Sequence, residues 1–458
     1  MTAVLVPAPA TPVHTPVRRW IPLALIFLSV GLSTAMAFPF LTLFLTSEVH
    51  ATPLRVTAFL IAAPLSSVLV STLVGHVSDR WPIRRPLLLG AALAGCTGAL
   101  LTSAVRDYWV LLGLTVTMTA AAGSILPQLF AHARTALHGS DRAAMTMSSL
   151  RTVFSLSWVA GPFLATVLLG LGRFALVYGF AATMYALAAL LIWRLLPESA
   201  PPARPAPEPA PAPAAGVPAE PVAVAAVDVA VVRGSGGCAS VAVPEPVAVA
   251  AVDVAVVRGS GGCAAVAVPE PDAVPDAPRR VIALTVAAFV LMQGAGNLGV
   301  QALPLFVTTD LRGDIGNAGL ILGLCAGLEI PLMLGFGFLS TRVPLRRLIL
   351  AGPLFSLAYM LTMASAERTW QVAAAQFFNA ATVALVHGLG VSYVQEMLPR
   401  HPGRASTLFT NAFPAGAVLA GPILGAAQHL GYRTAYLAGA VLAVAALALF
   451  CTARVPRR

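Results

Sequence analysis

The chain has 458 residues and a formal net charge of +10, and 58% of its residues are hydrophobic while only 10% are charged. Soluble domains carry about 25% charged residues, so this composition excludes an ordinary water-soluble protein. It predicts instead a protein whose outer surface faces the lipid bilayer.

Apolar segments of about 20 residues recur along the whole chain. They lie at 20–45, 54–76, 86–104, 109–133, 143–170, 174–195, 281–308, 316–340, 347–366, 369–396, 404–429 and 434–453. Each is long enough to cross ~30 Å of hydrocarbon as a helix. The sequence therefore predicts an all-α polytopic membrane protein with twelve transmembrane helices.

The basic residues indicate how these helices are oriented. All 28 residues counted as Lys and Arg are arginine. If the N-terminus is cytoplasmic, eighteen of them lie near cytoplasmic helix ends and six lie in outer loops. This asymmetry fits the positive-inside rule, so we expect an inner (plasma) membrane protein with both termini in the cytoplasm. The arginines are spread over many short loops rather than one face, so no nucleic-acid partner is expected.

The segment 197–278 differs from the rest in composition. It begins rich in Pro and Ala, which predicts an extended cytoplasmic linker. It then holds a tandem repeat of 25 residues, 221–245 and 246–270, whose copies differ only at Ser240 and Ala265. Two copies are too few for a solenoid. We favour a duplication in a tolerant loop over a docking or regulatory segment.

An older repeat relates the two parts of the chain on either side of this linker. GHVSDRWPIRR at 75–85 matches GFLSTRVPLRR at 337–347, and GPFLA at 161–165 matches GPILG at 421–425. The offsets are nearly equal, so we predict two six-helix halves, 1–196 and 279–458, related by duplication. Both halves start on the same side, which is the parallel-repeat arrangement of the major facilitator fold.

The first of these repeated motifs has a physical interpretation as a gate. Asp79 lies at the cytoplasmic end of the second span, where the helix dipole is negative and a carboxylate needs a positive partner. Such a contact could hold the cytoplasmic side shut in one state only. In the second copy Thr341 replaces Asp79, which restricts this latch to the first half. The alternative is that the arginines only set topology. The gating residues predicted on this basis are Gly75, Asp79, Arg80, Arg84, Arg85, Gly337, Arg342, Arg346 and Arg347.

Several strings resemble the bacterial sugar efflux transporters of the major facilitator superfamily. They are SILPQLFAHARTAL (124–137), SLRTVFSLSWVAGPFLA (149–165), AGLEIPLML (326–334), FFNAATVALVHGLGVSYVQEMLP (377–399) and ASTLFTNA (405–412). The resemblance runs through both halves and skips the linker. It implies proton-driven export of small sugars and glycosides, with alternating access.

Glu329 is the carboxylate that the sequence places midway along a span, here the eighth. A charge at this depth costs at least ~2.5–3.5 kcal/mol, so such residues usually serve a function. Glu329 could carry the coupling proton or bind a sugar hydroxyl, and the alternative is a static contact that joins two helices. His387 in the tenth span is a second candidate for proton coupling, although an intramembrane histidine can also be merely hydrogen-bonded.

Other polar residues within spans are candidates for sugar binding. Gln293 and Asn297 are four residues apart and share one face of the seventh span, where amides suit sugar hydroxyls. Arg151, in the fifth span, could point inward or extend to the cytoplasmic interface. Contacts between helices are the alternative role for the two amides. The complete set of predicted substrate-binding residues is Arg151, Gln128, Gln293, Asn297, Asn379 and Asn411.

The sequence thus predicts a secondary transporter that exports sugars or glycosides in exchange for protons. The pattern shows no metal cluster, nucleotide-binding loop or catalytic triad, so no enzyme activity, metal or cofactor is expected. The five cysteines lie in spans or in the linker, and no disulfide is predicted. The expected partners are a small sugar, protons and lipid, and the chain is expected to act as a monomer. A drug/proton antiporter of the same superfamily and a non-transporting membrane sensor are the alternatives.

Overall fold

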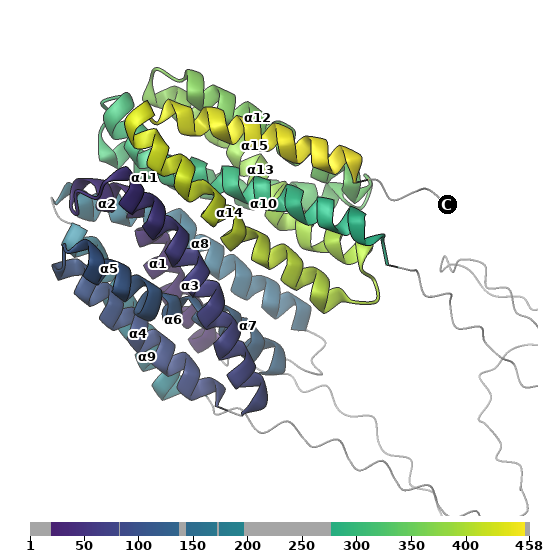
Figure 1. The fold of residues 1–458 in the computed structure, drawn as a ribbon. Helices are drawn as coiled ribbons and strands as arrows, with labels where there is room; N and C mark the ends of the chain where they lie inside the picture. The colour runs from purple at the N-terminus through teal and green to yellow at the C-terminus, as the bar shows by residue number, and fades with distance from the viewer. Residues whose placement is uncertain (1–19, 82, 137–142, 172–173, 197–275, 454–458) are drawn as a thin grey trace, which may run out of the picture. The chain divides into compact units, whose positions relative to one another are not determined.

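A computed structural model of the chain describes residues 20–81, 83–136, 143–171, 174–196 and 276–453. These residues are helical apart from short connections (Figure 1). Twelve helical spans among them are long and apolar enough to cross a membrane. The predicted all-α fold with twelve spans is therefore confirmed.

The helices follow the predicted apolar segments closely. In the first half they are α1 (Ile21–Ala37), η2 (Phe38–Phe40), α2 (Leu41–Ser47), α3 (Pro53–Arg80), α4 (Arg84–Ala104), α5 (Tyr108–Leu114), η3 (Thr115–Thr119), α6 (Ala120–Gly123), α7 (Ile125–Ala136), α8 (Ala143–Gly170) and α9 (Phe174–Leu195). In the second half they are α10 (Arg279–Leu305), η4 (Phe306–Asp310), α11 (Ile315–Leu339), α12 (Leu345–Ser365), α13 (Thr369–Met397), α14 (Pro402–Leu430) and α15 (Arg433–Thr452).

Three spans change their helical geometry part-way. In the first span, the 3-10 turn η2 separates α1 from α2 at Pro39, whose ring and missing N–H disturb a regular helix. The fourth and seventh spans contain the π-helical turns η3 and η4. Such turns recur at functional sites because they break the regular hydrogen-bond ladder.

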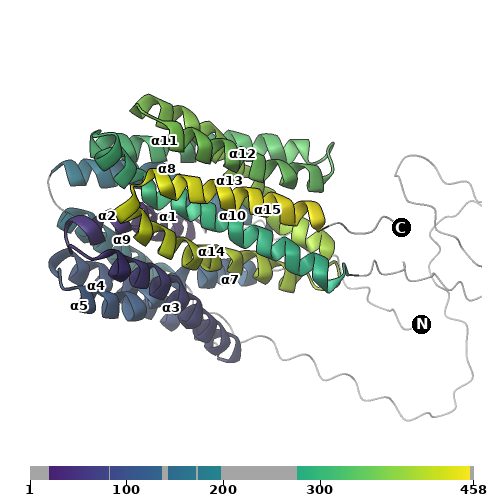
Figure 2. The same ribbon diagram turned by 45° about the horizontal axis from the view of Figure 1, so that its top comes forward.

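The helix pairings of the first half recur in the second. The first span, α1, packs against α8 and α9, and its counterpart α10 packs against α14 and α15. Likewise α4 packs against α9, and α12 against α15. Figure 2 shows α10 and α15 side by side along their length. This recurrence is the packing expected of two parallel repeats.

The two halves meet mainly through α3 with α14 and α8 with α11. We call the end of the bundle that carries residues 48–52 and 311–314 the predicted outer end, because few arginines lie there. At this end a Cβ added to Gly425 would collide with the Thr57 side chain, and one added to Gly319 would collide with Thr166. Glycines at these positions let the helices approach closely.

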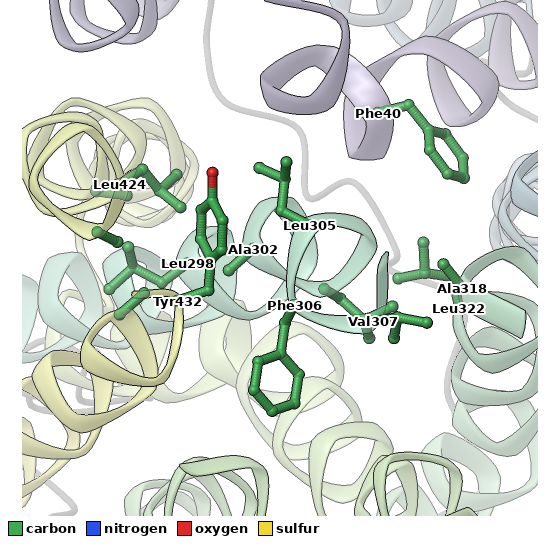
Figure 3. Packing of buried hydrophobic residues seen from close by; sticks show 14 of the residues in the cluster. Phe40, Leu298, Ala302, Leu305, Phe306, Val307, Ala318, Leu322, Leu424 and Tyr432 are labelled. Carbon is green, nitrogen blue, oxygen red and sulfur yellow. The ribbon is translucent and has the colours of Figure 1, made fainter. Parts of the chain in front are cut away.

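Aromatic and aliphatic side chains from both halves form one core at the predicted outer end. Figure 3 shows Phe40 of η2 near Leu305 and Val307 of the seventh span and Ala318 and Leu322 of α11. Phe40 is 1% exposed and Leu305 is 3% exposed. Burial of apolar surface thus joins the halves at this end.

The opposite end of the bundle, which carries Arg80 and Arg342, lacks such contacts among the described residues. Apart from the nearby backbone of its own helix, no described atom lies within 4 Å of a Cβ built on Gly75 or Gly337, where α3 and α11 approach this end. The halves are therefore joined at the predicted outer end and separate toward the predicted cytoplasmic end.

The described helices belong to one compact unit, Met1–Pro201 with Pro275–Arg458. The linker prediction and both copies of its repeat, 221–245 and 246–270, lie outside the described residues. The last linker residues before α10 are described, and Asp276 pairs there with the loop that follows α13. Asp276 Oδ2 lies 2.9 Å from His401 Nδ1, and the Ala277 N–H donates to the Met397 carbonyl at 2.8 Å. These contacts join the residues just before α10 to the end of α13.

Candidate functional site

Glu329 lies on α11 and is held by a thiol one turn earlier on the same helix. Cys325 and Glu329 are four residues apart, so their side chains project from the same face. The Cys325 thiol donates a hydrogen bond to Glu329 Oε1, with the two atoms 3.6 Å apart. Within the described part of the chain, Glu329 forms no ion pair. The carboxyl is therefore fixed by a weak neutral donor rather than by a cation.

A chain of hydrogen bonds from α13 supports this thiol. Asn379 Nδ2 donates to Cys325 Sγ at 3.3 Å and to Gln376 Oε1 at 3.2 Å. Gln376 Nε2 in turn donates to the Val372 carbonyl at 3.1 Å. Asn379 thus donates in two directions, through Cys325 toward the Glu329 carboxyl and through Gln376 toward the α13 backbone. The structure thus connects two of the predicted site residues, Glu329 and Asn379, through Cys325.

A second set of polar groups follows one face of α10. Gln293 and Asn297 are both buried, as their four-residue spacing predicts, and Asn297 Nδ2 donates to the Gln293 carbonyl at 2.8 Å. Asn297 Oδ1 is buried and has no hydrogen-bond partner among the described residues. An unpaired buried acceptor calls for a water or ligand donor. This is the property expected of a group that binds a hydroxyl.

Gln301 continues the same face and reaches the first half. Its Oε1 accepts a hydrogen bond of 2.8 Å from the hydroxyl of Thr42 on α2, and both residues are buried. The sequence interpretation missed Gln301, although Gln293, Asn297 and Gln301 repeat at intervals of four. It also missed Cys325, which the spacing to Glu329 would have indicated, and Gln376, which lies one turn before Asn379.

Arg151 and His387 come from opposite halves and lie within electrostatic reach of each other. Arg151 projects from α8 and is exposed, while His387 on α13 is partly buried. The His387 ring packs edge-on against Phe409 of α14, with ring centroids 6.4 Å apart. One residue that the sequence assigned to sugar binding and one assigned to proton coupling thus lie within electrostatic reach of each other across the halves.

An aromatic group lies where α1 gives way to η2. Phe38 packs edge-on against Trp158 of α8 at a centroid distance of 6.0 Å, and its ring is tilted against that of Phe413 of α14 at 6.2 Å. Phe38 and Trp158 belong to the first half and Phe413 to the second. Aromatic rings at this junction can pack against an apolar face of a ligand.

The remaining two predicted substrate residues are apart from the Glu329 network. Gln128 is buried on α7, and its Oε1 has no partner among the described residues. Asn411 is exposed on α14, two residues before Phe413. The structure therefore gathers Glu329 with Asn379, aligns Gln293 with Asn297, and places Arg151 near His387.

Arginines of the gating motif contact helix ends within their own half. Arg85 Nη2 donates to the Trp193 carbonyl at the end of α9 at 2.6 Å, and Arg346 Nη2 donates to the Phe450 carbonyl of α15 at 3.3 Å. Positive charge at a helix C-terminus is stabilising. Arg84 Nη1 donates to the Ala131 carbonyl at 3.5 Å.

The other members of the motif show fewer contacts. Arg80, Arg342 and Arg347 are all exposed, and Arg342 lies over the Phe338 ring at 4.8 Å. The Asp79 side chain lies outside what the structure describes. The latch therefore stays a prediction, and the described contacts are of the kind that stabilise each half.

The profile of the Major Facilitator Superfamily matches residues 23–258 and 284–458. "Sugar efflux transporter A" of Dickeya chrysanthemi is 31% identical over 420 residues, which cover 91% of this chain and 90% of that one. The chain belongs to the sugar efflux transporter family of the Major Facilitator Superfamily. A Deinococcus radiodurans protein named as a candidate sugar efflux transporter is 33% identical over 428 residues, covering 93% of this chain and 95% of that one.

The fold agrees with this membership. The crystal structure of the nucleoside transporter NupG superposes with a TM-score of 0.65 at 11% identity, covering 95% of this chain and 98% of that one. At this identity the likeness concerns the fold of these transporters alone. The predicted family is confirmed, and the protein is a multi-pass membrane protein of a transporter superfamily.

Proposed function

We propose that this protein exports sugars or glycosides across the inner membrane in exchange for protons. Relatives named sugar efflux transporters match almost the whole chain, which supports the substrate class. The single observation that supports the coupling is Glu329, a carboxyl within a span. It accepts a hydrogen bond from the Cys325 thiol, which Asn379 in turn holds, and no cation of the described residues pairs with it. A carboxyl that alternates between apolar surroundings and water binds a proton in the first and releases it in the second.

The contacts between the halves support alternating access. Buried side chains join the halves at the predicted outer end, whereas the glycines Gly75 and Gly337 have no close neighbours toward the other end. If both termini are cytoplasmic, this arrangement is the state that takes up substrate from the cytoplasm. Export then requires these outer contacts to part while the cytoplasmic end closes.

The polar groups of α10 suit a sugar. Asn297 Oδ1 offers a buried acceptor, and Gln293 lies one turn away on the same face. Phe38, Trp158 and Phe413 supply apolar surface for the C–H face of a sugar ring. We propose that the protein has no catalytic activity, because its relatives are named transporters. That it works as a monomer and without a cofactor remains our expectation from the sequence.

A drug/proton antiporter is the second candidate, and the aromatic group at Phe38 favours it. A flat apolar ligand would be held by the three rings and would leave the amides of α10 unused. The two candidates share the role of Glu329, so substrate selection is what separates them.

Vesicle transport tests the proposal directly. The purified protein in liposomes is assayed with a panel of labelled sugars, glycosides and drugs, with and without an imposed proton gradient. Gradient-dependent movement of a sugar and release of protons in the opposite direction are expected. Movement of drugs alone would favour the second candidate, and the absence of any gradient dependence would contradict proton exchange.

A further inference from the structure

Two tyrosine hydroxyls are buried in the second half behind the Glu329 network. Tyr359 of α12 is 1% exposed and Tyr436 of α15 is 0% exposed. Their rings pack edge-on, with centroids 6.3 Å apart. Neither hydroxyl has a hydrogen-bond partner among the residues that the structure describes. Buried hydroxyls are nearly always paired, so two adjacent unpaired ones indicate groups that work with water or with a mobile proton.

Tyr359 lies next to the hydrogen-bond chain that holds Glu329. Its hydroxyl faces the Gln376 side chain without reaching hydrogen-bonding geometry, and it lies within electrostatic reach of the Cys325 thiol. The α10 backbone passes close by, since a Cβ added to Gly299 would lie 3.2 Å from the Tyr359 hydroxyl oxygen. The hydroxyl is therefore enclosed by α10, α12 and α13 on the side of Cys325.

Tyr436 extends the same line toward the predicted outer end. It packs against Phe306 with a centroid distance of 5.2 Å and lies within electrostatic reach of Asp310, the last residue of η4. Asp310 is partly buried and accepts a hydrogen bond of 3.1 Å from the Thr309 hydroxyl. Burial, with a smaller effect from the charge of Asp310, raises the pKa of Tyr432 to about 12, so this neighbouring hydroxyl stays neutral.

On the basis of the proposed function, we propose that Tyr436, Tyr359 and Cys325 form a proton relay that connects Asp310 at the predicted outer end with Glu329. This route runs through the interior of the second half. It is separate from the contact surface between the halves, where the sugar must pass. The proton path and the sugar path then enter the protein at different places on the predicted outer end, where Phe40, Leu305 and their neighbours line the closed sugar path.

The chemistry of the three groups suits a relay. A hydroxyl or thiol can accept a proton on its oxygen or sulfur while it donates its own to the next group. A proton that enters at Asp310 moves in this way to Tyr436, to Tyr359 and to Cys325, with water molecules bridging where the groups are not in contact. The Cys325 proton passes to the Glu329 carboxylate along the 3.6 Å hydrogen bond, which yields a neutral carboxylic acid. Each intermediate group ends with the proton count it started with.

Arg151 and His387 provide the competing route. Arg151 on α8 and His387 on α13 are titratable or charged groups on the two helices that pack against α11. A proton that reaches Glu329 through His387 would cross the surface between the halves. Only the relay depends on the tyrosine hydroxyls, so removal of one hydroxyl should slow proton movement along the relay and leave the route through His387 unchanged.

The test compares single-atom changes along the relay in proteoliposomes. Tyr359→Phe removes one hydroxyl, Cys325→Ala removes the thiol, and Cys325→Ser replaces it with another group that both accepts and donates. Tyr178→Phe, in the buried core of the first half, is the matched control. Sugar-driven proton movement is measured with a pH-sensitive dye, and sugar–sugar exchange is measured on the same preparation as a check on folding and binding.

The relay predicts that Tyr359→Phe and Cys325→Ala each slow proton movement about tenfold. A positioned proton-transfer group usually contributes about 10²–10⁴-fold, but here a water molecule can partly replace the missing hydroxyl or thiol. Exchange should be unchanged, and Cys325→Ser and Tyr178→Phe should behave as wild type. Equal proton movement in wild type and Tyr359→Phe would overturn the relay alone. The absence of sugar-driven proton movement in wild type would overturn the proposed function and the relay together.

Discussion

The Thr42 hydroxyl donates a 2.8 Å hydrogen bond to Gln301 Oε1, and the two residues belong to opposite halves of the molecule. Thr42 is 0% exposed and Gln301 is 3% exposed, so water does not compete for this bond. It lies among the apolar contacts that join the halves at the predicted outer end. An export cycle must break it every time that end opens.

Thr42→Val should therefore shift the protein toward the state that is open at the predicted outer end. Interhelical hydrogen bonds in membranes contribute about 0.6–1.7 kcal/mol, which corresponds to a ~3- to 20-fold change in the equilibrium. Spin labels at the exposed positions 54 and 430, near the outer ends of α3 and α14, would report the shift as a larger population of long distances. Thr46→Val is the matched control because the hydrogen bonds that the Thr46 hydroxyl makes within the described structure go to carbonyls of its own helix. Identical distance distributions in Thr42→Val and wild type would contradict this role.

The extent of each span could be predicted because it depends on a local property, the length of an apolar run. The position of Glu329 on α11 and the shared face of Gln293 and Asn297 on α10 followed in the same way, from helical spacing. These features need no knowledge of which helices are neighbours.

The partners of these residues depend on tertiary packing, which the sequence pattern does not specify. Asn379 lies 54 positions from Cys325, and only the packing of α13 on α11 brings them to 3.3 Å. Thr42 and Gln301 are 259 positions apart, and the packing of α10 beside α2 brings them into hydrogen-bonding distance. Tyr359 and Tyr436 are unremarkable in sequence, because a buried hydroxyl becomes informative only when its surroundings are known.

Asp79→Asn tests the predicted latch at the cytoplasmic end. The substitution removes the negative charge and keeps the shape, so net transport should fall while equilibrium sugar binding stays largely intact. Thr341→Val, at the equivalent position of the second copy, should have no effect because that copy lacks the acid. Binding and flux should be measured on the same preparations. A loss of binding that equals the loss of flux would show that Asp79 acts at the substrate site instead.

Deletion of 246–270 tests whether the linker repeat is passive. Flux and membrane abundance should both be unchanged. The distance that a Pro/Ala-rich linker can span changes little when 25 of its residues are removed. Deletion of 221–245 is the matched variant, since the two copies differ only at Ser240 and Ala265. If either deletion lowered flux at normal abundance, the repeat would have a role in transport.

Glu329→Gln distinguishes three roles for the carboxyl held by Cys325. A residue that binds sugar as an anion would lose affinity on this change, by about 1.5–3 kcal/mol for a charged hydrogen bond. A residue that only joins two helices would leave flux almost unaltered, or would lower stability and abundance together. A proton carrier would lose coupling alone, because glutamine mimics its neutral form.

The most direct test of the account is to measure sugar binding, sugar–sugar exchange and gradient-driven flux on this one variant in proteoliposomes, across a range of pH. If Glu329 carries the coupling proton, Glu329→Gln will bind and exchange sugar like wild type, while driven flux and its pH dependence are lost. Driven flux at the wild-type rate with the wild-type pH profile would contradict the account, and His387 would then be the group to test.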